Sequence, residues 1–254
     1  MIDILTNSRS LPHSNETVCF FAVRNNDEDV MKYQWILFDA DETLFHFDAF
    51  KGLQLMFSRH DIVFTEDDFL EYQQLNKPLW INYQEGKITA SELKNQRFQL
   101  WSAKSGLSTD QLNRDFLNAM ADICTLLPHA KELIDSLKGR AKLGIITNGF
   151  TDLQQIRLEK TGLDDAFDLL VISEQVGYPK PAKEIFDYAL KHMGQAEPNH
   201  VLMVGDNIDT DILGGINAGM ETCWLNVDGK IQPNHIKPSV CVQNLLELEQ
   251  YLLN

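Results

Sequence analysis

Residues 35–43 read Trp35-Ile36-Leu37-Phe38-Asp39-Ala40-Asp41-Glu42-Thr43, an unbroken apolar run that ends in two closely spaced aspartates. An apolar run of this length without alternation is typical of a strand that is covered on both faces. Acidic side chains at the end of such a strand lie where parallel sheets bind their ligands. The stretch therefore predicts a parallel sheet with a polar site at its strand ends.

Similar apolar runs recur along the chain, at residues 143–146, 169–172, 201–204 and 222–225. Segments with helical spacing lie between them, at residues 130–137, 152–161, 182–192 and 209–218. Strands that alternate with single helices are typical of a doubly wound α/β fold around a parallel sheet. We expect a fold of this class.

One long interval interrupts the alternation. Residues 48–130 show apolar side chains at helical spacing, such as Leu53, Met56 and Phe57, and no strand alternation. An interval of this length is too long for a loop. We therefore expect a polar extension, a two-segment core domain and an inserted helical cap domain, at residues 1–30, 31–47 with 126–254, and 48–125.

The extension, residues 1–30, is rich in Asn, Ser and Asp and has no sustained periodicity. We expect it to be either disordered or the product of an upstream start of the reading frame. Its longest apolar stretch, Val18–Val23, follows no basic segment and does not resemble a signal peptide. Since no apolar run approaches the ~20 residues that cross a bilayer, we expect a cytoplasmic protein.

Composition excludes several functions. The 254 residues carry 22 Lys and Arg against 37 Asp and Glu, which gives a formal net charge of −15. This shortage of basic charge argues against binding to nucleic acids or anionic membranes. The four cysteines form no CxxC pair, so we expect buried thiols in a reducing compartment rather than a zinc or disulfide framework.

Polar motifs follow the predicted strands, at Asp39–Thr43, Thr147-Asn148-Gly149, Lys180-Pro181 and Gly205–Asp211. The carboxyl ends of parallel strands converge on one crevice, so these motifs should meet there. Carboxylates, a hydroxyl and an ammonium in one crevice are suited to phosphoryl transfer, with the repulsion between Asp39 and Asp206 relieved by Mg²⁺.

Each group has a candidate role in that chemistry. Asp39 is the candidate nucleophile, which would form an aspartyl-phosphate. Asp41 can protonate the leaving alcohol and then take a proton from the hydrolytic water. Phosphate oxygens can be held by Thr147, by the amides of Asn148 and Gly149, and by Lys180.

Plainer interpretations stay open for single residues. Asp39 and Asp41 could cap a turn, and Lys180 could be a solvated surface charge. Asp209 is interpreted as an acid in the first turn of a helix, whereas Asp211 is expected to contact the metal indirectly, for example through water. His46 is expected to be a loop residue and not a ligand.

Taken in order, the motifs resemble those of haloacid dehalogenase superfamily phosphatases. They match at Asp39-x-Asp41-x-Thr43, Thr147, Lys180 and Gly205-Asp206-x4-Asp211, from about Met31 to the C-terminus, and the insertion resembles a C1-type cap. The resemblance implies a Mg²⁺-dependent hydrolase, in which Mn²⁺ or Co²⁺ can substitute. It also implies Asp39 as nucleophile, Asp41 as acid/base with its carbonyl on the metal, and Asp206 as a further ligand.

Within the superfamily, Asp41 distinguishes the chain from dehalogenases and phosphonatases, which lack this second acid. Longer strings are similar to bacterial house-cleaning 5′-nucleotidases that prefer pyrimidines, namely Phe38–Phe45, Asn76–Trp80, Ile145–Phe150, Val201–Asp206 and Asp211–Gly219. The departures are the extension and Tyr178-Pro179 before Lys180, and neither touches a catalytic side chain. The resemblance implies a nucleoside monophosphate substrate, and we expect a monomer or homodimer.

Three aromatic residues of the insertion, Trp80, Tyr83 and Trp101, are candidates for stacking on a base, with packing in the cap core as the alternative. A phosphatase of another small metabolite, such as a sugar phosphate or phosphoglycolate, is the second functional prediction. Two other classes stay open: a phospho-acceptor signalling domain, which would be shorter and lack a cap, and a metal-free binding protein.

Overall fold

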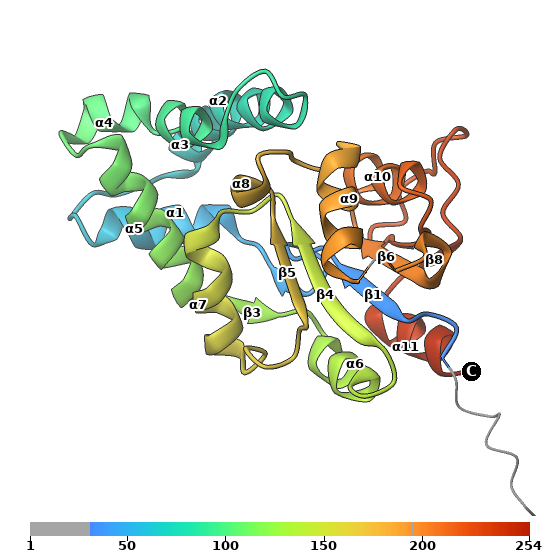
Figure 1. The fold of residues 1–254 in the computed structure, drawn as a ribbon. Helices are drawn as coiled ribbons and strands as arrows, with labels where there is room; N and C mark the ends of the chain where they lie inside the picture. Colours follow the sequence, from blue (N-terminus) through green and yellow to red (C-terminus); the bar gives the residue numbers. More distant parts are fainter. Residues whose placement is uncertain (1–30, 195) are drawn as a thin grey trace, which may run out of the picture. The chain divides into compact units, whose positions relative to one another are not determined.

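A computed structural model describes residues 31–194 and 196–254. Its main sheet has six parallel strands in the order β5-β4-β1-β6-β7-β8 (Figure 1). The strands are β1 (Trp35–Phe38), β4 (Lys142–Thr147), β5 (Leu169–Ile172), β6 (Val201–Gly205), β7 (Glu221–Leu225) and β8 (Val240–Val242). The five strands predicted from apolar runs are confirmed, and β8 is an additional edge strand.

The register of the central strands aligns the polar motifs. Phe38 of β1 pairs with Ile145 of β4 on one side and with Val204 of β6 on the other. The backbone N–H of Asp39 continues the ladder by donating to the Val204 carbonyl at 2.8 Å. The residues that follow these three strands therefore start from the same level of the sheet.

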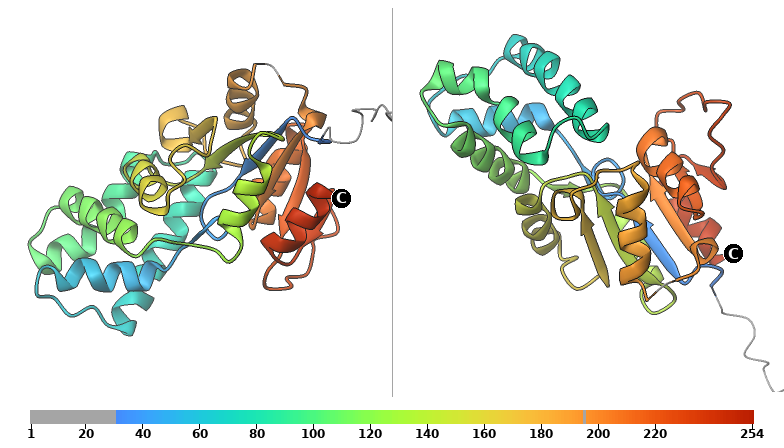
Figure 2. Two further views of the ribbon diagram at one scale, coloured as in Figure 1. Left: turned by 90° about the horizontal axis from the view of Figure 1, so that it is seen from below. Right: turned by 45° about the horizontal axis from the view of Figure 1, so that its top comes forward.

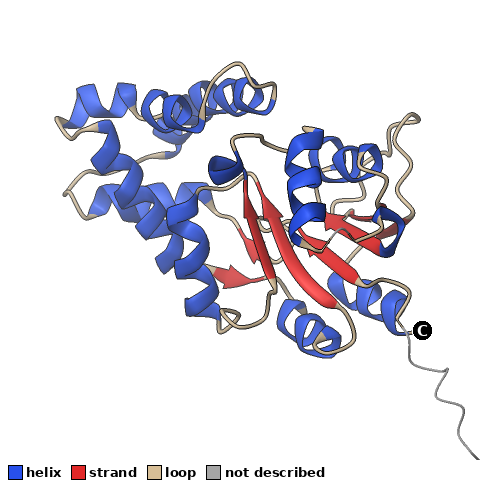
Figure 3. Ribbon diagram, viewed as in Figure 1, coloured by secondary structure: helices blue, strands red, loops and turns tan. Residues whose placement is uncertain are grey.

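Both faces of the sheet are covered by helices (Figure 3). On one face, Ile36 and Phe38 pack in a cluster with α6 (Ala130–Leu137) and α11 (Leu245–Leu253). On the other face, Trp35 and Leu37 pack with α9 (Lys183–His192). Alternate residues of β1 thus serve two apolar cores, which explains its unbroken apolar sequence.

Further helical segments connect the strands: α7 (Thr151–Thr161), α8 (Ser173–Val176), a 3₁₀ turn (Pro198–His200), a π-helical turn (Ile208–Ile212) and α10 (Leu213–Asn217). The continuous helix expected over 209–218 is therefore wrong in detail. Asn207 caps the π-helical turn by accepting from the backbone N–H groups of Asp209 and Thr210, at 3.0 and 3.1 Å. The chain leaves α10 at Gly219, whose φ of +79° favours glycine.

The segment between β1 and β4 is helical, as expected. It contains α1 (Ala49–Ser58), α2 (Glu66–Gln84), α3 (Ala90–Gln96), α4 (Gln99–Ser105) and α5 (Thr109–Asp122). These helices share an apolar cluster of their own, in which Leu53, Met56 and Phe57 are fully buried. Figure 2 shows them gathered beyond one end of the sheet. The exact domain boundaries stay a prediction.

Two short strands, β2 (Phe45–His46) and β3 (Thr125–Leu126), pair antiparallel where the chain enters and leaves this helical segment. α2 and α3 each begin with a capping box, at Thr65 with Asp68 and at Thr89 with Glu92. Such boxes satisfy backbone N–H groups that a helix start leaves unpaired. The starts of both helices are therefore fixed locally by sequence.

The cysteines differ from expectation in part. Cys223 is buried and Cys124 half-buried, but Cys241 on β8 is exposed, and these three are free thiols. Cys19 and the proposed extension, 1–30, lie outside the described residues. Within the described residues, no helix is both long and apolar enough to cross a membrane.

Candidate active site

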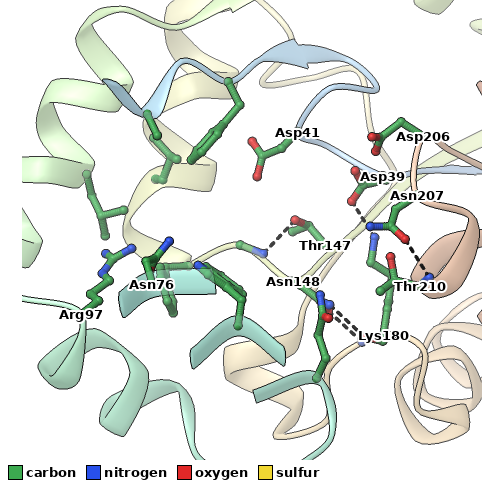
Figure 4. Close-up of a pocket in the computed structure, with 18 of the residues that line it drawn as sticks. Asp39, Asp41, Asn76, Arg97, Thr147, Asn148, Lys180, Asp206, Asn207 and Thr210 are labelled. Carbon is green, nitrogen blue, oxygen red and sulfur yellow. Dashed lines mark hydrogen bonds and ion pairs between the residues drawn. The ribbon is translucent and has the colours of Figure 1, made fainter. Parts of the chain in front are cut away.

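A buried charge cluster lies at the carboxyl ends of β1 and β6. The Nζ atom of Lys180 lies 2.5 Å from Oδ1 of Asp39 (Figure 4) and 2.7 Å from Oδ1 of Asp211. All three side chains are almost inaccessible, with Lys180 only 2% exposed. The interpretation of Lys180 as a solvated surface charge is therefore wrong.

The threonine of the first motif joins two loops. Thr43 is fully buried, and its Oγ1 accepts from the backbone N–H of Asp206 at 3.1 Å. The same hydroxyl lies 3.5 Å from Oδ2 of Asp39. The indole Nε1 of Trp224 donates to the carbonyl of Asp206 at 2.9 Å, which fixes the second loop from its other side. Thr43 thus sets the spacing between the two aspartates.

The π-helical turn directs Asp211 back into the site. Oδ2 of Asp211 accepts from the backbone N–H of Asn207 at 3.1 Å, and Oδ1 accepts from the Thr210 hydroxyl at 3.2 Å. π-helical turns are rare and are found mostly at functional sites. Asp209, by contrast, is exposed, as its interpretation as a helix-start acid requires.

Gly205 gives Asp211 its space. A Cβ at position 205 would lie 2.2 Å from Oδ2 and 2.4 Å from Cβ of Asp211. Since Asp211 is held by Lys180 and Asn207, it cannot move aside without breaking the cluster. The need for glycine before Asp206 therefore comes from close packing.

We expect Gly205→Ala to lower the free energy of unfolding by about 1–3 kcal/mol, the usual range for overpacking a core. Denaturant unfolding of the purified protein measures it. Gly52→Ala is the comparison, because its Cβ would meet the flexible thioether of Met120. A loss for Gly205→Ala no larger than that for Gly52→Ala would contradict the packing argument.

The motif after β4 is fastened to the lysine loop. The side chain of Asn148 accepts from the backbone N–H of Lys180 at 2.7 Å and donates to its carbonyl at 3.0 Å. The Thr147 hydroxyl accepts from the backbone N–H of Gly149 at 2.9 Å. Thr147 and Lys180 are therefore held in fixed relation to each other.

Asp41 has a partner that the sequence did not indicate. Nη1 of Arg157, on α7, forms an ion pair with Oδ1 of Asp41, and Nη2 binds Gln154. Arg157 is 2% exposed, and its guanidinium lies 4.4 Å from the ring centre of Phe45. It orients the Asp41 side chain at the cavity wall.

Burial shifts the acidity of the site. Burial raises the pKa of Asp39 to about 7, with the Lys180 ammonium opposing the rise and Asp211 adding to it. Burial, together with Asp211, also raises the pKa of Asp206 to about 7. Burial alone would lower the pKa of Lys180, but the Asp211 and Asp39 carboxylates outweigh it, so that this pKa is raised. The cluster holds more negative charge than one ammonium can balance.

The donor set fits a hard dication. Asp39, Asp206 and Asp211 each offer a carboxylate oxygen, and these oxygens lie within 4.8 Å of one another. When all three carboxylates are ionised, they and one ammonium leave two negative charges, which a divalent cation would neutralise. Oxygen-only ligands are the preference of Mg²⁺. His46 is an exposed residue of β2 beside Glu42, so the expectation that it lies in a loop is wrong.

The cluster opens into a cavity of about 270 Å³, to whose wall the helical segment also contributes. Asp39, Asp41, Thr147, Asn148, Gly149, Lys180, Asp206 and Asp211 line it, so the structure brings all the predicted site residues together. Tyr72, Asn76, Trp80 and Arg97 also line it, with Asn76 and Arg97 at the end away from Asp206 (Figure 4). Neither Arg97 nor Arg157 belongs to a motif, and no pattern in the sequence reveals that an arginine is buried.

The three candidate aromatics divide. Trp80 lines the cavity and lies 5.4 Å from the ring of Phe150. Trp101 instead packs against Phe57 and Phe64 in the apolar cluster of the helical segment, at 5.5 and 5.1 Å. Tyr83 is buried and its hydroxyl lies 2.8 Å from Oγ of Ser173. For Trp101 and Tyr83 the packing interpretation holds.

Two named proteins and one solved structure match most of this chain. The chain is 56% identical to pyrimidine 5′-nucleotidase YjjG of Escherichia coli over 87% of its length and 99% of the relative's. It is 31% identical to pyrimidine 5′-nucleotidase PynA of Streptococcus pneumoniae, over 87% and 93% of the two chains. The magnesium-bound crystal structure of YfnB from Bacillus subtilis, 34% identical, superposes with a TM-score of 0.76 over 87% of this chain and 98% of that one.

The family model of haloacid dehalogenase-like hydrolases matches residues 33–219, which include every motif residue of the cavity. The match covers more than half of the chain, and the fold with its parallel sheet is shared with the solved relative YfnB. The chain therefore belongs to the haloacid dehalogenase-like hydrolase family.

Proposed function

We propose that this protein is a Mg²⁺-dependent 5′-nucleotidase that hydrolyses pyrimidine nucleoside monophosphates. The observation that carries the proposal is the cluster of Asp39, Asp206 and Asp211 with Lys180 in one cavity at the strand ends. The names of two relatives, at 56% and 31% identity, support the substrate.

The proposed reaction has two steps. A carboxylate oxygen of Asp39 attacks phosphorus, the bond to the 5′ oxygen of the nucleoside breaks, and an aspartyl-phosphate forms. Asp41 gives its proton to the departing oxygen. It then takes a proton from the water that attacks the aspartyl-phosphate, which releases inorganic phosphate and regenerates Asp39.

The other side chains hold the phosphoryl group. The Thr147 hydroxyl and the amides of Asn148 and Gly149 would bind its oxygens. Lys180, fixed through Asn148, would supply positive charge beside Asp39. Thr147 and Lys180 come from two loops that Asn148 ties together, so little reorganisation is needed during the reaction.

Mg²⁺ would be held by Asp39, Asp206 and the carbonyl of Asp41, with Asp211 in indirect contact. Its chemistry is to neutralise charge on the phosphoryl oxygens. We further propose that residues 48–125 act as a cap that excludes water and selects the substrate. The cytoplasmic location and the monomeric or dimeric state stay predictions.

A substrate panel tests the proposal. Purified protein is assayed with UMP, dUMP, dTMP, purine monophosphates, hexose phosphates and phosphoglycolate. We expect the highest kcat/KM for the pyrimidine monophosphates. Faster turnover of hexose phosphates or phosphoglycolate would reject the 5′-nucleotidase and favour a phosphatase of another small metabolite.

Arg157 provides a test of the role of Asp41. We expect Arg157→Met to lower kcat for UMP about 10- to 100-fold, because general acid catalysis depends on a correctly placed donor. The decrease in kcat should be smaller with p-nitrophenyl phosphate, because its leaving group does not need a proton. Arg157→Lys should restore part of the activity. Equal losses on the two substrates would assign Arg157 a purely structural role.

A further inference from the structure

The far end of the cavity holds a buried cation. Arg97 follows α3, is 3% exposed and lines the cavity. Its guanidinium lies 5.0, 5.2 and 4.9 Å from the ring centres of Phe98, Phe116 and Phe150. These rings stabilise the charge through their faces. Because they offer no hydrogen-bond acceptors, the donors of the guanidinium need other partners.

Those donors are incompletely satisfied. Nη2 of Arg97 donates to Oδ1 of Asn113, and Tyr72 shares a side-chain hydrogen bond with the guanidinium. The Glu174 carboxylate, which is paired with Lys94, attracts the guanidinium without a direct ion pair. Nε has no hydrogen-bond partner among residues 31–194 and 196–254, and within the same residues no carboxylate forms an ion pair with Arg97. A buried charged donor without a full set of partners is costly. The arrangement is that of a site that a ligand oxygen completes.

Asn76 supplies a hydrogen-bond acceptor to the same cavity. It lies on α2 between Tyr72 and Trp80, and the spacing of four residues places all three on one face of the helix. All three line the cavity with Arg97. Oδ1 of Asn76 is buried and has no hydrogen-bond partner in the described part of the chain. It is therefore a free acceptor on the same cavity as the unpartnered Nε of Arg97.

Neighbouring contacts place Asn76 beside Arg97. The ring of Tyr72 lies 5.8 Å from that of Phe98, and the ring of Trp80 lies 5.4 Å from that of Phe150. Both partner rings also flank the guanidinium of Arg97. In Figure 4, Asn76 and Arg97 project into the cavity at the end away from Asp206.

We propose that Arg97 and Asn76 bind the edge of the pyrimidine base, with Arg97 donating to a ring carbonyl and Oδ1 of Asn76 accepting from N3–H. The inference rests on the proposed function and adds the residues that would select the base. Uracil and thymine present a carbonyl, an N–H and a second carbonyl in a row, which this donor and acceptor pair can match. Cytosine lacks the N3–H, so UMP and dTMP should be preferred to CMP.

The test uses the full-length protein and three substrates: UMP, its N3-methyl derivative and ribose 5-phosphate, which has no base. The variants are Asn76→Leu and Arg97→Gln. Gln74→Leu, exposed on α2, and Arg114→Gln, exposed on α5, are the matched controls. Circular dichroism and a thermal melt establish that each variant is folded.

We expect Asn76→Leu and Arg97→Gln to lower the ratio of kcat/KM for UMP to that for ribose 5-phosphate at least tenfold, with both controls unchanged. N3-methylation of UMP should lower the kcat/KM of the wild type by about the same factor as the Asn76→Leu substitution does. In the Asn76→Leu variant, methylation should cause no further decrease in kcat/KM. If Arg97→Gln fails to fold, Asn76→Leu and the methylated substrate decide the question.

Two results would overturn the inference. One is an unchanged ratio of UMP to ribose 5-phosphate in a folded Asn76→Leu variant. The other is an equal decrease in kcat/KM on N3-methylation of UMP in the wild type and in the Asn76→Leu variant. A failure of the proposed function looks different, because the wild type itself would then turn over ribose 5-phosphate better than UMP.

Discussion

Turnover of UMP is expected to fall by about 10⁴-fold or more when Asp39 is replaced by asparagine, as is typical when an enzyme loses its nucleophile. The amide oxygen is neutral and cannot form the aspartyl-phosphate. Asp39→Asn should stay folded, because it removes one of three carboxylates that crowd around a single ammonium. Steady-state assays with a coupled phosphate readout measure the loss.

Asp209→Asn is the matched control for this variant, since Asp209 is exposed and lies in the π-helical turn after β6. It should keep wild-type activity. Intact turnover by Asp39→Asn would reject the nucleophile. A phosphorylated wild-type protein that persists for hours with Mg²⁺ would instead indicate a phospho-acceptor signalling domain, because an enzyme must hydrolyse its intermediate quickly.

Removal of divalent metal should lower activity almost as much as the Asp39→Asn substitution does, by roughly 10³-fold or more. The reason is electrostatic, because the cluster of Asp39, Asp206 and Asp211 with Lys180 is already negative before a phosphate dianion enters. The measurement is an assay after dialysis against a chelator, followed by titration with Mg²⁺. Mn²⁺ or Co²⁺ should restore part of the rate.

Metal binding can also be followed without turnover. Mg²⁺ should raise the melting temperature of the wild type, because a bound cation stabilises only the folded state. Asp206→Asn should show a smaller rise, and Asp209→Asn the same rise as the wild type. Full activity after exhaustive chelation, together with no thermal shift, would reject the metal site.

The sheet was largely predictable because buried parallel strands have unbroken apolar sequences. β1 and β6 show this signal fully. β8 does not, since its three residues Val240–Val242 form an edge strand with the exposed Cys241 at its centre. Edge strands are short and partly solvated, so their sequences resemble loops.

The acidic and lysine motifs were predictable because they follow strands whose ends converge. The buried arginines were not, because burial of Arg97 and Arg157 depends on which rings and carboxylates the packed helices bring to them. The same limit applies to Trp80 and Trp101. Both belong to helices of one segment, and only the packing of those helices decides which ring faces the cavity.

The helices of 49–122 and the sheet have separate apolar clusters. Phe150, which follows β4, and Leu153, on α7, belong to the cluster of the helices. The reacting groups belong to strand ends, whereas Asn76 and Arg97 belong to the helical segment. Substitutions that repack the helices therefore leave the ladder that carries Asp39 undisturbed. Such a division lets evolution, or a mutant library limited to the helices, change which phosphate ester is accepted without rebuilding the machinery that cleaves it.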